Sequence, residues 1–437
     1  MKRNILLSIL VATAIAPSFA GGILTHTNQS IQFLRMIARG ATVDVDGVYY
    51  NPAGLAFLED GTYLSLNIQS AYQTRSISSQ FALFPLAGDA TRNYKANVNA
   101  PVLPSVFAVY KTNNWAFSGS FAVIGGGGKA DFKTGLPMFD KLTMSTLAAY
   151  NIMPNAYELN SAVEGSQYAF GVQLGASYRL SDSFAVFGGA RIDYMQAGYN
   201  GFIRATLHSN PNATPMDLGL DVKQSTWGVT PILGVDMQFG NLNASVKYEF
   251  KTSATFTNKT LLSGESSSDP TLQGTLMAAG FGDGAKVPND IPALLQVAAG
   301  YEFLPNLRAG IEYHHFYDRK AGMGAAHKEQ YLTGGTNEYL GGVEWDINDR
   351  FTVSGGYQKT DYGLSDEFQS DLSFSLDSYS IGLGGAIRLN ESLRLNVAYF
   401  WTTYDDYVND ATANGVTNVD TYSRTNKVFG IGIDYTF

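Results

Sequence analysis

The sequence contains no cysteine, and after its first twenty residues it contains no long apolar run. The absence of cysteine excludes disulfides and thiolate metal sites. A membrane-spanning helix needs about 20 apolar residues, so any later membrane crossing must be made by strands. Charged residues are scarce, at 15%, and acidic residues outnumber basic ones by 38 to 29. This acidic balance argues against binding to nucleic acid.

The first twenty residues have the composition of an export signal. Two basic residues precede the apolar stretch Ile5–Ala16, and the small residues Ser18 and Ala20 mark a cleavage site before Gly21. We therefore expect residues 1–20 to be a signal peptide, so that the mature chain lies outside the cytoplasm.

From Thr62 to the end, apolar and polar residues alternate with a period of two, which predicts strands. Fourteen segments follow this pattern, near 61–77, 102–111, 114–125, 166–180, 183–208, 218–240, 242–256, 292–304, 306–319, 337–348, 350–362, 375–389, 392–408 and 423–437. Short connectors alternate with long ones, which lie near 78–101, 126–165, 209–217, 257–291, 320–336, 363–374 and 409–422. Short turns on one rim and long loops on the other are typical of outer-membrane barrels.

The two faces of these segments differ in polarity. In segment 242–252, Leu242 and Val246 share one face, while Lys247 and Glu249 lie on the other. A Lys or Arg on the lipid face costs about 2–4 kcal/mol at the membrane midplane, so the charged face must point inward. The last segment alternates in the same way and ends on Phe437. We predict an all-β fold: a 14-stranded antiparallel transmembrane β-barrel, multi-pass in the outer membrane. A soluble sandwich or propeller would also alternate, but no 40-residue repeat supports a propeller.

Residues 21–58 do not alternate, and they form a separate piece ahead of the barrel, which we place at 59–437. Ser30–Gly40 predicts a short helix ending at Gly40. Asn51, Pro52 and Ala53, followed by a glycine, predict a turn.

Two long connectors, 126–165 and 257–291, are apolar as well as long. Their apolar residues are Leu136, Met138, Phe139, Leu142, Met144 and Leu147 in the first, and Leu276, Met277 and Phe281 in the second. They could pack together as a lid with a small core, or form a hydrophobic capture groove at the cell surface, and the two interpretations are compatible.

A carboxylate ligand of such a groove would need a cation at its mouth. The candidates are Lys129, Lys133, Lys141 and Lys286, for each of which the alternative is an ordinary solvated lysine. Gly125, Gly126, Gly127 and Gly128 follow the third strand. They predict either a bulge that interrupts the ladder or a flexible start of the next loop.

The segment 39–56, which contains Asn51, Pro52 and Ala53, resembles the hatch of the FadL-type outer-membrane transporters. That family includes long-chain fatty-acid transporters and aromatic-hydrocarbon transporters. The resemblance implies a monomeric fourteen-stranded barrel blocked by an N-terminal hatch (21–58), with no cofactor. It also implies that ligand enters at surface loops, moves to a deeper apolar site and leaves sideways through the wall, where Gly125–Gly128 follow the strand that is kinked in the family.

These observations favour passive uptake of hydrophobic small molecules, most simply long-chain fatty acids, in contact with outer-membrane lipid and lipopolysaccharide. Each buried methylene contributes about 0.8 kcal/mol, so an apolar groove can draw a fatty acid from water. An aromatic-hydrocarbon channel is the alternative within the family, and an aqueous porin or a barrel hydrolase using His314, Glu312 and Asp318 are alternatives outside it. We expect no enzyme activity, because the sequence has no Gly-x-Ser-x-Gly motif and no P-loop. We expect no metal site, since the adjacent His314 and His315 point to opposite faces of a strand.

Overall fold

A single antiparallel sheet closes on itself to form the body of the protein. The computed structural model describes residues 23 and 25–437, and the expected signal peptide lies outside these residues. The first strand, β1 (Gly61–Phe81), pairs with the last, β17 (Asn418–Thr436), from Tyr63 opposite Thr436 to Phe81 opposite Asn418. The predicted barrel is therefore closed.

Fifteen further strands lie between β1 and β17 in the sequence: β2 (Arg92–Thr112), β3 (Trp115–Phe132), β4 (Tyr157–Arg179), β5 (Phe184–Leu207), β6 (Met216–Phe239), β7 (Leu242–Glu249), β8 (Thr255–Gly264), β9 (Lys286–Pro288), β10 (Leu294–Leu304), β11 (Leu307–Phe316), β12 (Asn337–Asp346), β13 (Phe351–Asp361), β14 (Ser378–Arg388), β15 (Leu393–Tyr404) and β16 (Tyr407–Asp410).

The seventeen strands of the described residues occupy fourteen positions around the wall. Three positions hold two strands in succession: β7 and β8 both pair with β6, β9 and β10 pair with β8 and β7, and β15 and β16 both pair with β17. This arrangement confirms the fourteen-stranded antiparallel barrel.

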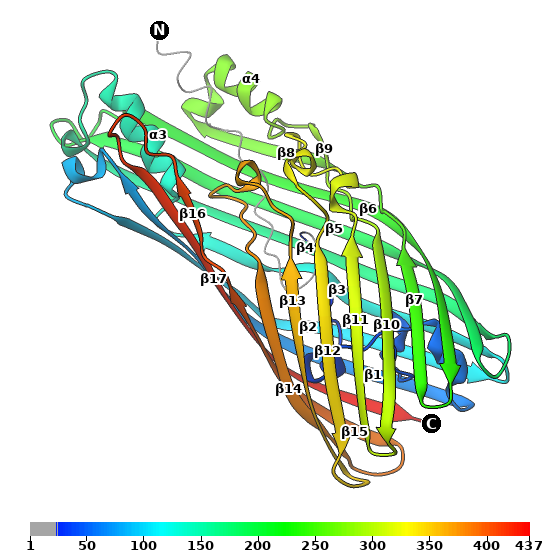
Figure 1. Cartoon of the computed structure of the whole chain (residues 1–437). Coiled ribbons are helices and arrows are strands. Elements are labelled where there is room, and N and C mark those ends of the chain that lie inside the picture. Colours follow the sequence, from blue (N-terminus) through cyan, green and yellow to red (C-terminus); the bar gives the residue numbers. More distant parts are fainter. Residues whose placement is uncertain (1–22, 24) are drawn as a thin grey trace.

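Helical segments lie before the barrel and in its long loops. Figure 1 shows α3 and α4 at one end of the barrel and the C-terminus toward the other. The α-helices are α1 (Ile31–Arg35), α2 (Gly47–Tyr50), α3 (Pro137–Ala148) and α4 (Pro270–Ala278). The 3₁₀ turns are η2 (Ala53–Phe57), η3 (Phe84–Ala87), η4 (Pro154–Ala156), η5 (Glu265–Ser267), η6 (Asp318–Lys320), η7 (Lys328–Tyr331) and η8 (Asp366–Phe368). Within residues 23 and 25–437, no helix is long and apolar enough to span a membrane.

The outer face of the wall carries a band of exposed apolar side chains. Leu174, Ile192, Val229 and Ile311 are each at least half exposed. A water-soluble protein would not leave such side chains around its whole circumference, whereas a barrel in lipid requires them. The chain is thus a multi-pass protein of the outer membrane.

Several strands extend well beyond the predicted ends. β2 begins at Arg92 rather than near 102, β3 runs to Phe132, and β4 begins at Tyr157 rather than near 166. The connectors 78–101 and 126–165 accordingly contain strand at their ends, and 257–291 contains most of β8 and all of β9 as well as α4.

The polarity of the wall inverts along these extensions. In β2, Tyr94, Ala96 and Val98 are buried inside the barrel, while Lys95 and Asn97 are exposed outside. Near the periplasmic end the interior is polar instead, as the buried Lys247 and Glu249 of β7 show. The expectation of a charged inner face was therefore wrong along this part of β2. Where the wall extends beyond the lipid, its outer face meets water. The polar side chains of the alternation can therefore point outward there, and the apolar ones point inward.

Residues 26–58 pack against the inner face of the barrel wall, and we call this segment the hatch. Ser30 caps α1 by accepting a 2.9 Å hydrogen bond from the backbone N–H of Phe33. The predicted helix to Gly40 was too long, because α1 ends at Arg35 and the chain then crosses the strands β12 to β14 at very short range. A Cβ on Gly356 would lie 2.6 Å from the backbone nitrogen of Ile37, and one on Gly342 would lie 2.9 Å from Met36 Cγ. The wall admits the hatch because it lacks side chains there.

This close packing leads to a first prediction. Gly356→Ala should destabilise the folded barrel by about 1–3 kcal/mol, because the new methyl group overlaps the hatch backbone. Denaturant unfolding followed by the heat-dependent gel shift of the barrel measures the change. The matched variant Gly341→Ala has its nearest atom 3.9 Å from the new Cβ and should leave stability unchanged. Equal effects of the two variants would contradict the packing argument.

Candidate functional site: the hatch, the apolar chamber and the wall opening

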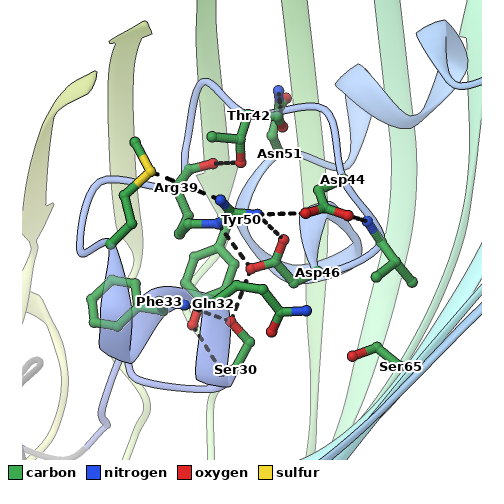
Figure 2. Close-up of polar contacts among 12 residues, drawn as sticks. Ser30, Gln32, Phe33, Arg39, Thr42, Asp44, Asp46, Tyr50, Asn51 and Ser65 are labelled. Carbon is green, nitrogen blue, oxygen red and sulfur yellow. Dashed lines mark hydrogen bonds and ion pairs between the residues drawn. The ribbon is translucent and has the colours of Figure 1, made fainter. Parts of the chain in front are cut away.

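A network of buried charges anchors the hatch at its base. Arg39 Nη2 lies 2.7 Å from Asp46 and 3.1 Å from Asp44, and Ser30 Oγ donates to Asp46 at 2.8 Å (Figure 2). Arg394 of β15 extends the network to the wall through a 2.7 Å contact with Asp44. Burial raises the pKa of the Asp44 carboxyl, but the guanidinium groups of Arg394 and Arg39 outweigh it and hold the pKa below its usual value. The hatch is thus bound to the wall by ionised groups.

The space below this network is polar. A cavity lined in part by Arg39, Asp44, Arg308, Glu344 and Arg394 opens beside the short turns. An apolar molecule gains nothing by entering such a cavity, because the charged groups would lose their hydration without receiving partners.

The turn Asn51-Pro52-Ala53 contacts the opposite side of the wall. Asn51 Nδ2 donates a 2.6 Å hydrogen bond to Asp236 of β6, and the carbonyl oxygen of Pro52 accepts one of 2.6 Å from Ser177 of β4. Ala53 is buried beside Phe187 and Ile232. These three residues therefore anchor the second half of the hatch to β4, β5 and β6.

The wall has an interruption between β2 and β3. Ser105 pairs with Ala122 and Val98 pairs with Ala130, but residues 99–104 of β2 and 123–129 of β3 do not pair with each other. The two strands have different reasons to separate. β2 carries Pro101 and Pro104, which have no N–H to donate, and the four glycines Gly125–Gly128 lie on β3.

The glycines of β3 also produce bulges against β4. Register shifts occur between Val123 and Gly125 and between Gly126 and Gly128. Gly126 has a φ of +67°, and a Cβ there would lie 2.6 Å from the carbonyl carbon of Gln167, so only glycine fits. Sequence analysis pointed to the glycines of β3, whereas it placed Pro101 in a loop and missed the two prolines of β2.

The first residues of the hatch lie behind this opening. The N–H of His26 donates to the carbonyl oxygen of Ile124 at 3.0 Å, and Ser105 Oγ donates to the carbonyl oxygen of Gln29 at 2.6 Å. Asn28 and Gln69 of β1 exchange two hydrogen bonds, of 3.1 and 2.7 Å. The hatch thus supplies hydrogen-bond partners on the inner side of the opening.

Above the hatch, the interior of the barrel is largely apolar, and we call this region the chamber. Inward side chains of β1 to β6 form a buried cluster there, among them Ile77, Val98, Ile124, Met195 and Val222. A cavity with about 640 Å³ of atom-free space, counted with its open mouth, lies in this region between β5, β6 and the loops. Three of the predicted groove residues line it: Phe139, Leu276 and Phe281.

The other predicted groove residues lie around α3 and α4. Pro137 at the first turn and Asp140 nearby favour the start of α3. Leu142, Met144 and Leu147 of α3 pack against Leu272 of α4 in one buried cluster. Leu136 is buried in the chamber, Met138 is partly buried against it, and Met277 is half exposed. The two helices therefore share a small core, as the lid interpretation expects.

A surface groove runs between these helices. It is lined by Leu147, Tyr150 and Ile152 on one side and by Glu265, Pro270 and Leu272 on the other. Its atom-free space is about 1550 Å³ including the open mouth. The groove and the chamber cavity share the loop that carries α4.

The four candidate lysines are scattered. Lys141 is held by Asp420 at 2.6 Å and Asn418 at 2.7 Å, and Lys129 lies on the outer face of β3, 2.5 Å from Glu164. Lys133 and Lys286 are exposed. The structure does not bring the four together, because strand extension moved Lys129 and Lys286 out of the loops.

Three buried cations that sequence analysis missed gather in the chamber instead. Arg75 and Arg424 are opposite each other on β1 and β17, and both face inward. Arg75 donates a 2.7 Å hydrogen bond to the carbonyl oxygen of Phe374, and Lys328 Nζ lies 3.4 Å from that of Ser373. Burial and the charge of Arg75 lower the pKa of Lys328 to about 7. The available sequence signal was the alternation of β1 and β17, which turns Arg75 and Arg424 to the inner face together with polar residues such as Gln73.

The residues considered for a hydrolase belong to a different network. His314 lies between two carboxylates, 2.5 Å from Glu312 and 2.7 Å from Glu338, and Glu312 also accepts the N–H of Gly40 of the hatch at 2.8 Å. Asp318 accepts the N–H of Thr336 at 2.7 Å. These contacts bind strands and hatch together. In the part of the chain that the structure describes, no group of three His, Asp or Glu side chains could hold a metal ion.

A second prediction concerns the hatch turn. Asn51→Ala should destabilise the barrel by about 1–3 kcal/mol, because the buried Asp236 carboxylate loses a donor. A double-mutant cycle with Asp236→Ala, measured by denaturant unfolding, isolates the pair. A coupling energy near zero would mean that the 2.6 Å contact contributes nothing to holding the turn.

A third prediction concerns pH. Burial lowers the pKa of His26 from 6.5 to about 4. Its Nδ1 lies 3.1 Å from the side-chain amide nitrogen of Gln29, and it can accept the hydrogen bond from this amide only while it carries no proton. A released segment 25–30 binds a proton at higher pH than the docked one. Docking should therefore be complete above about pH 6.5 and weaken steadily as the pH falls toward 4.

Hydrogen exchange of segment 25–30, corrected for the intrinsic pH effect, measures this dependence. The variant His26→Asn cannot titrate and should lose it. A pH profile that is the same in both proteins would show that another group is responsible.

Comparison with known proteins places the fold. No protein-family model matches the sequence, and no curated protein does. A FadL homologue from Pseudomonas aeruginosa has a similar structure, with a TM-score of 0.71 and 14% identity over 95% of this chain and 99% of that one. The toluene transporters TodX of Pseudomonas putida (TM-score 0.55, 13% identity, 96% and 99% covered) and TbuX of Ralstonia pickettii (0.54, 14%, 94% and 97%) are also similar. The chain therefore has the fold of the FadL-type outer-membrane transporters.

Proposed function

We propose that this protein transports hydrophobic small molecules, most simply long-chain fatty acids, passively across the outer membrane. Ligand is captured in the groove between α3 and α4, passes into the apolar chamber, and leaves through the opening between β2 and β3 into the membrane. No chemical step and no cofactor are required, because partition into lipid and consumption of the ligand inside the cell drive transport.

The observation that carries this proposal is the interrupted ladder between β2 and β3. A barrel wall in lipid normally pairs every backbone N–H and C=O, so unpaired residues need a reason. Here residues 99–104 and 123–129 separate beside the apolar chamber, and Ala100, Val123 and Ile124 at the opening are buried and apolar. On the outside, Val102 and Phe121 are exposed toward lipid. An apolar molecule can pass from chamber to membrane here without crossing a charged surface.

The hatch supports a sideways rather than a downward exit. The charge network of Arg39, Asp44, Asp46 and Arg394 lies across the direct route to the periplasm, and the cavity below it is polar. These features oppose an aqueous porin as well, since the hatch and its ion pairs lie across the bore.

One observation favours a fatty acid over an aromatic hydrocarbon. Arg75, Arg424 and Lys328 gather at the chamber, and positive charge there suits a carboxylate headgroup. A neutral hydrocarbon would gain nothing from these cations.

A fourth prediction tests the exit. The chain has no cysteine, so the pair His26→Cys and Ile124→Cys introduces a single possible disulfide between the hatch and β3. The 3.0 Å backbone hydrogen bond between these residues brings their Cα atoms within disulfide range. Uptake of labelled oleate by cells lacking their own fatty-acid transporter should fall strongly under oxidising conditions and recover on reduction.

The control is a disulfide away from the opening. Ser76→Cys and Ser423→Cys replace two hydroxyls 3.3 Å apart on the outer face of β1 and β17, and oxidation there should not affect uptake. If the hatch tether formed and oleate uptake continued unchanged, the lateral route would be excluded. Uptake of toluene but not oleate would favour the hydrocarbon channel, while ion conductance would indicate a porin and lipid hydrolysis an enzyme.

A further inference from the structure

The outer face of the barrel carries a polar groove on the long-loop side of its apolar band. The groove lies on β4, β5, β6 and β8, and its atom-free space is about 1200 Å³ including the open side. Gly198 forms part of its floor, because its missing side chain leaves a gap between Ser166 of β4 and Lys223 of β6, its cross-strand neighbours. This groove faces away from the chamber and plays no part in the proposed transport route.

Two lysines lie side by side in the groove. Lys223 of β6 and Lys259 of β8 are directly opposite each other in the ladder, and both are exposed. Like charges directly opposite each other across two strands repel. Two carboxylates also line the groove: Glu164 is paired with Lys129, and Asp221 is two residues from Lys223 on the same face. In the described part of the chain, neither of them lies within 4 Å of the Lys223 or Lys259 ammonium group. A bound anion would relieve the repulsion.

The position of the pair relative to the membrane identifies the source of that anion. Below Lys223 on the same face of β6 come Ser225, Trp227 and Val229. Trp227 is 67% exposed and packs against Tyr194 with ring centroids 4.6 Å apart, as expected at a membrane interface. Lys223 is four residues from Trp227 along a tilted strand, which places it about 10 Å farther from the membrane midplane. This is the level of the lipid headgroups.

The direction of β6 places the lysine pair in the outer leaflet of the membrane. β6 begins after a long loop and ends at the short turn before β7, so Lys223 lies near the cell-surface end. The outer leaflet of this membrane consists of lipopolysaccharide, whose lipid A headgroup carries phosphates. The groove offers two ammonium groups to a phosphate and the neutral polar side chains of Ser166, Gln196 and Asn200 to a sugar.

We propose that the groove around Lys223 and Lys259 is a binding site for the phosphorylated headgroup of lipopolysaccharide. The acyl chains of the bound lipid would lie along the apolar band below Trp227. The site would position one lipid molecule against the wall that bears α4 and the surface loops.

Native mass spectrometry of the purified barrel with added diphosphoryl lipid A tests the site. Lys223→Gln with Lys259→Gln should weaken binding about tenfold or more, since both charge-assisted contacts to the phosphate are lost. Lys223→Arg with Lys259→Arg should retain it. The matched control, Lys359→Gln with Lys427→Gln, removes two exposed outward lysines that are not neighbours and should change binding less than twofold.

Two ligand comparisons make the outcome decisive. Dephosphorylated lipid A should bind the native protein as weakly as diphosphoryl lipid A binds the double glutamine variant. Phosphatidylglycerol should compete poorly, because it has no sugar headgroup. Equal loss in the control variant, unchanged binding in the Lys223 and Lys259 variant, or equal binding of phosphatidylglycerol would each overturn the proposal. Oleate uptake in liposomes free of lipopolysaccharide should be the same in all variants, which separates this test from that of the transport function.

Discussion

Satisfying backbone hydrogen bonds within lipid is the constraint on which this structure depends. Each N–H and C=O of a strand in the membrane needs a partner, and only a closed sheet provides one for every strand. The pairing of β1 with β17 closes the sheet, so that each of the fourteen wall positions has a neighbouring strand on both sides. Closure also dictates the alternation of side chains, so that one set meets the surroundings and the other fills the bore.

The opening between β2 and β3 is notable because it departs from this rule. Its cost is reduced in two ways: Pro101 and Pro104 have no N–H to satisfy, and His26 of the hatch donates to the otherwise available carbonyl of Ile124. The hatch is therefore a structural part of the wall as well as an obstruction of the bore. Any movement of residues 26–29 would expose the opening, which couples the state of the hatch to the exit that we propose.

The interior is divided into two environments by the hatch. Toward the periplasm, charged residues of hatch and wall neutralise one another in a network that is costly to break once buried. Toward the cell surface, the same alternation presents apolar side chains inward. In the transport that we propose, a ligand that gains free energy by leaving water would occupy the second environment rather than the first.

The strands were predicted correctly where one face of the alternating pattern contacts lipid, and their ends were missed where the outer face contacts water. The fourteen strands were recognisable because apolar residues such as Leu242 and Val246 must face hydrocarbon. The extension of β2 to Arg92 was missed because its apolar face, with Tyr94 and Val98, points inward and its polar face points to water. The length of α1 was overestimated because close contact with Gly342 and Gly356 is a property of distant strands. Doubled glycines inside strand segments would have been a usable signal for that contact.

The sequence by itself determined the closed barrel, its strand number and the separate N-terminal piece, because periodicity and turn residues act over a few neighbouring positions. Only the tertiary structure decided which residues meet. Arg39 finds Asp46 nearby, but Arg394 reaches Asp44 across 350 positions of sequence. Likewise, Lys223 and Lys259 become neighbours only through the register of β6 with β8. The prolines of β2 come to lie opposite the glycines of β3 only because residues 105–112 of β2 pair with residues 115–122 of β3. Such meetings depend on the register and closure of the whole sheet, which no local pattern contains.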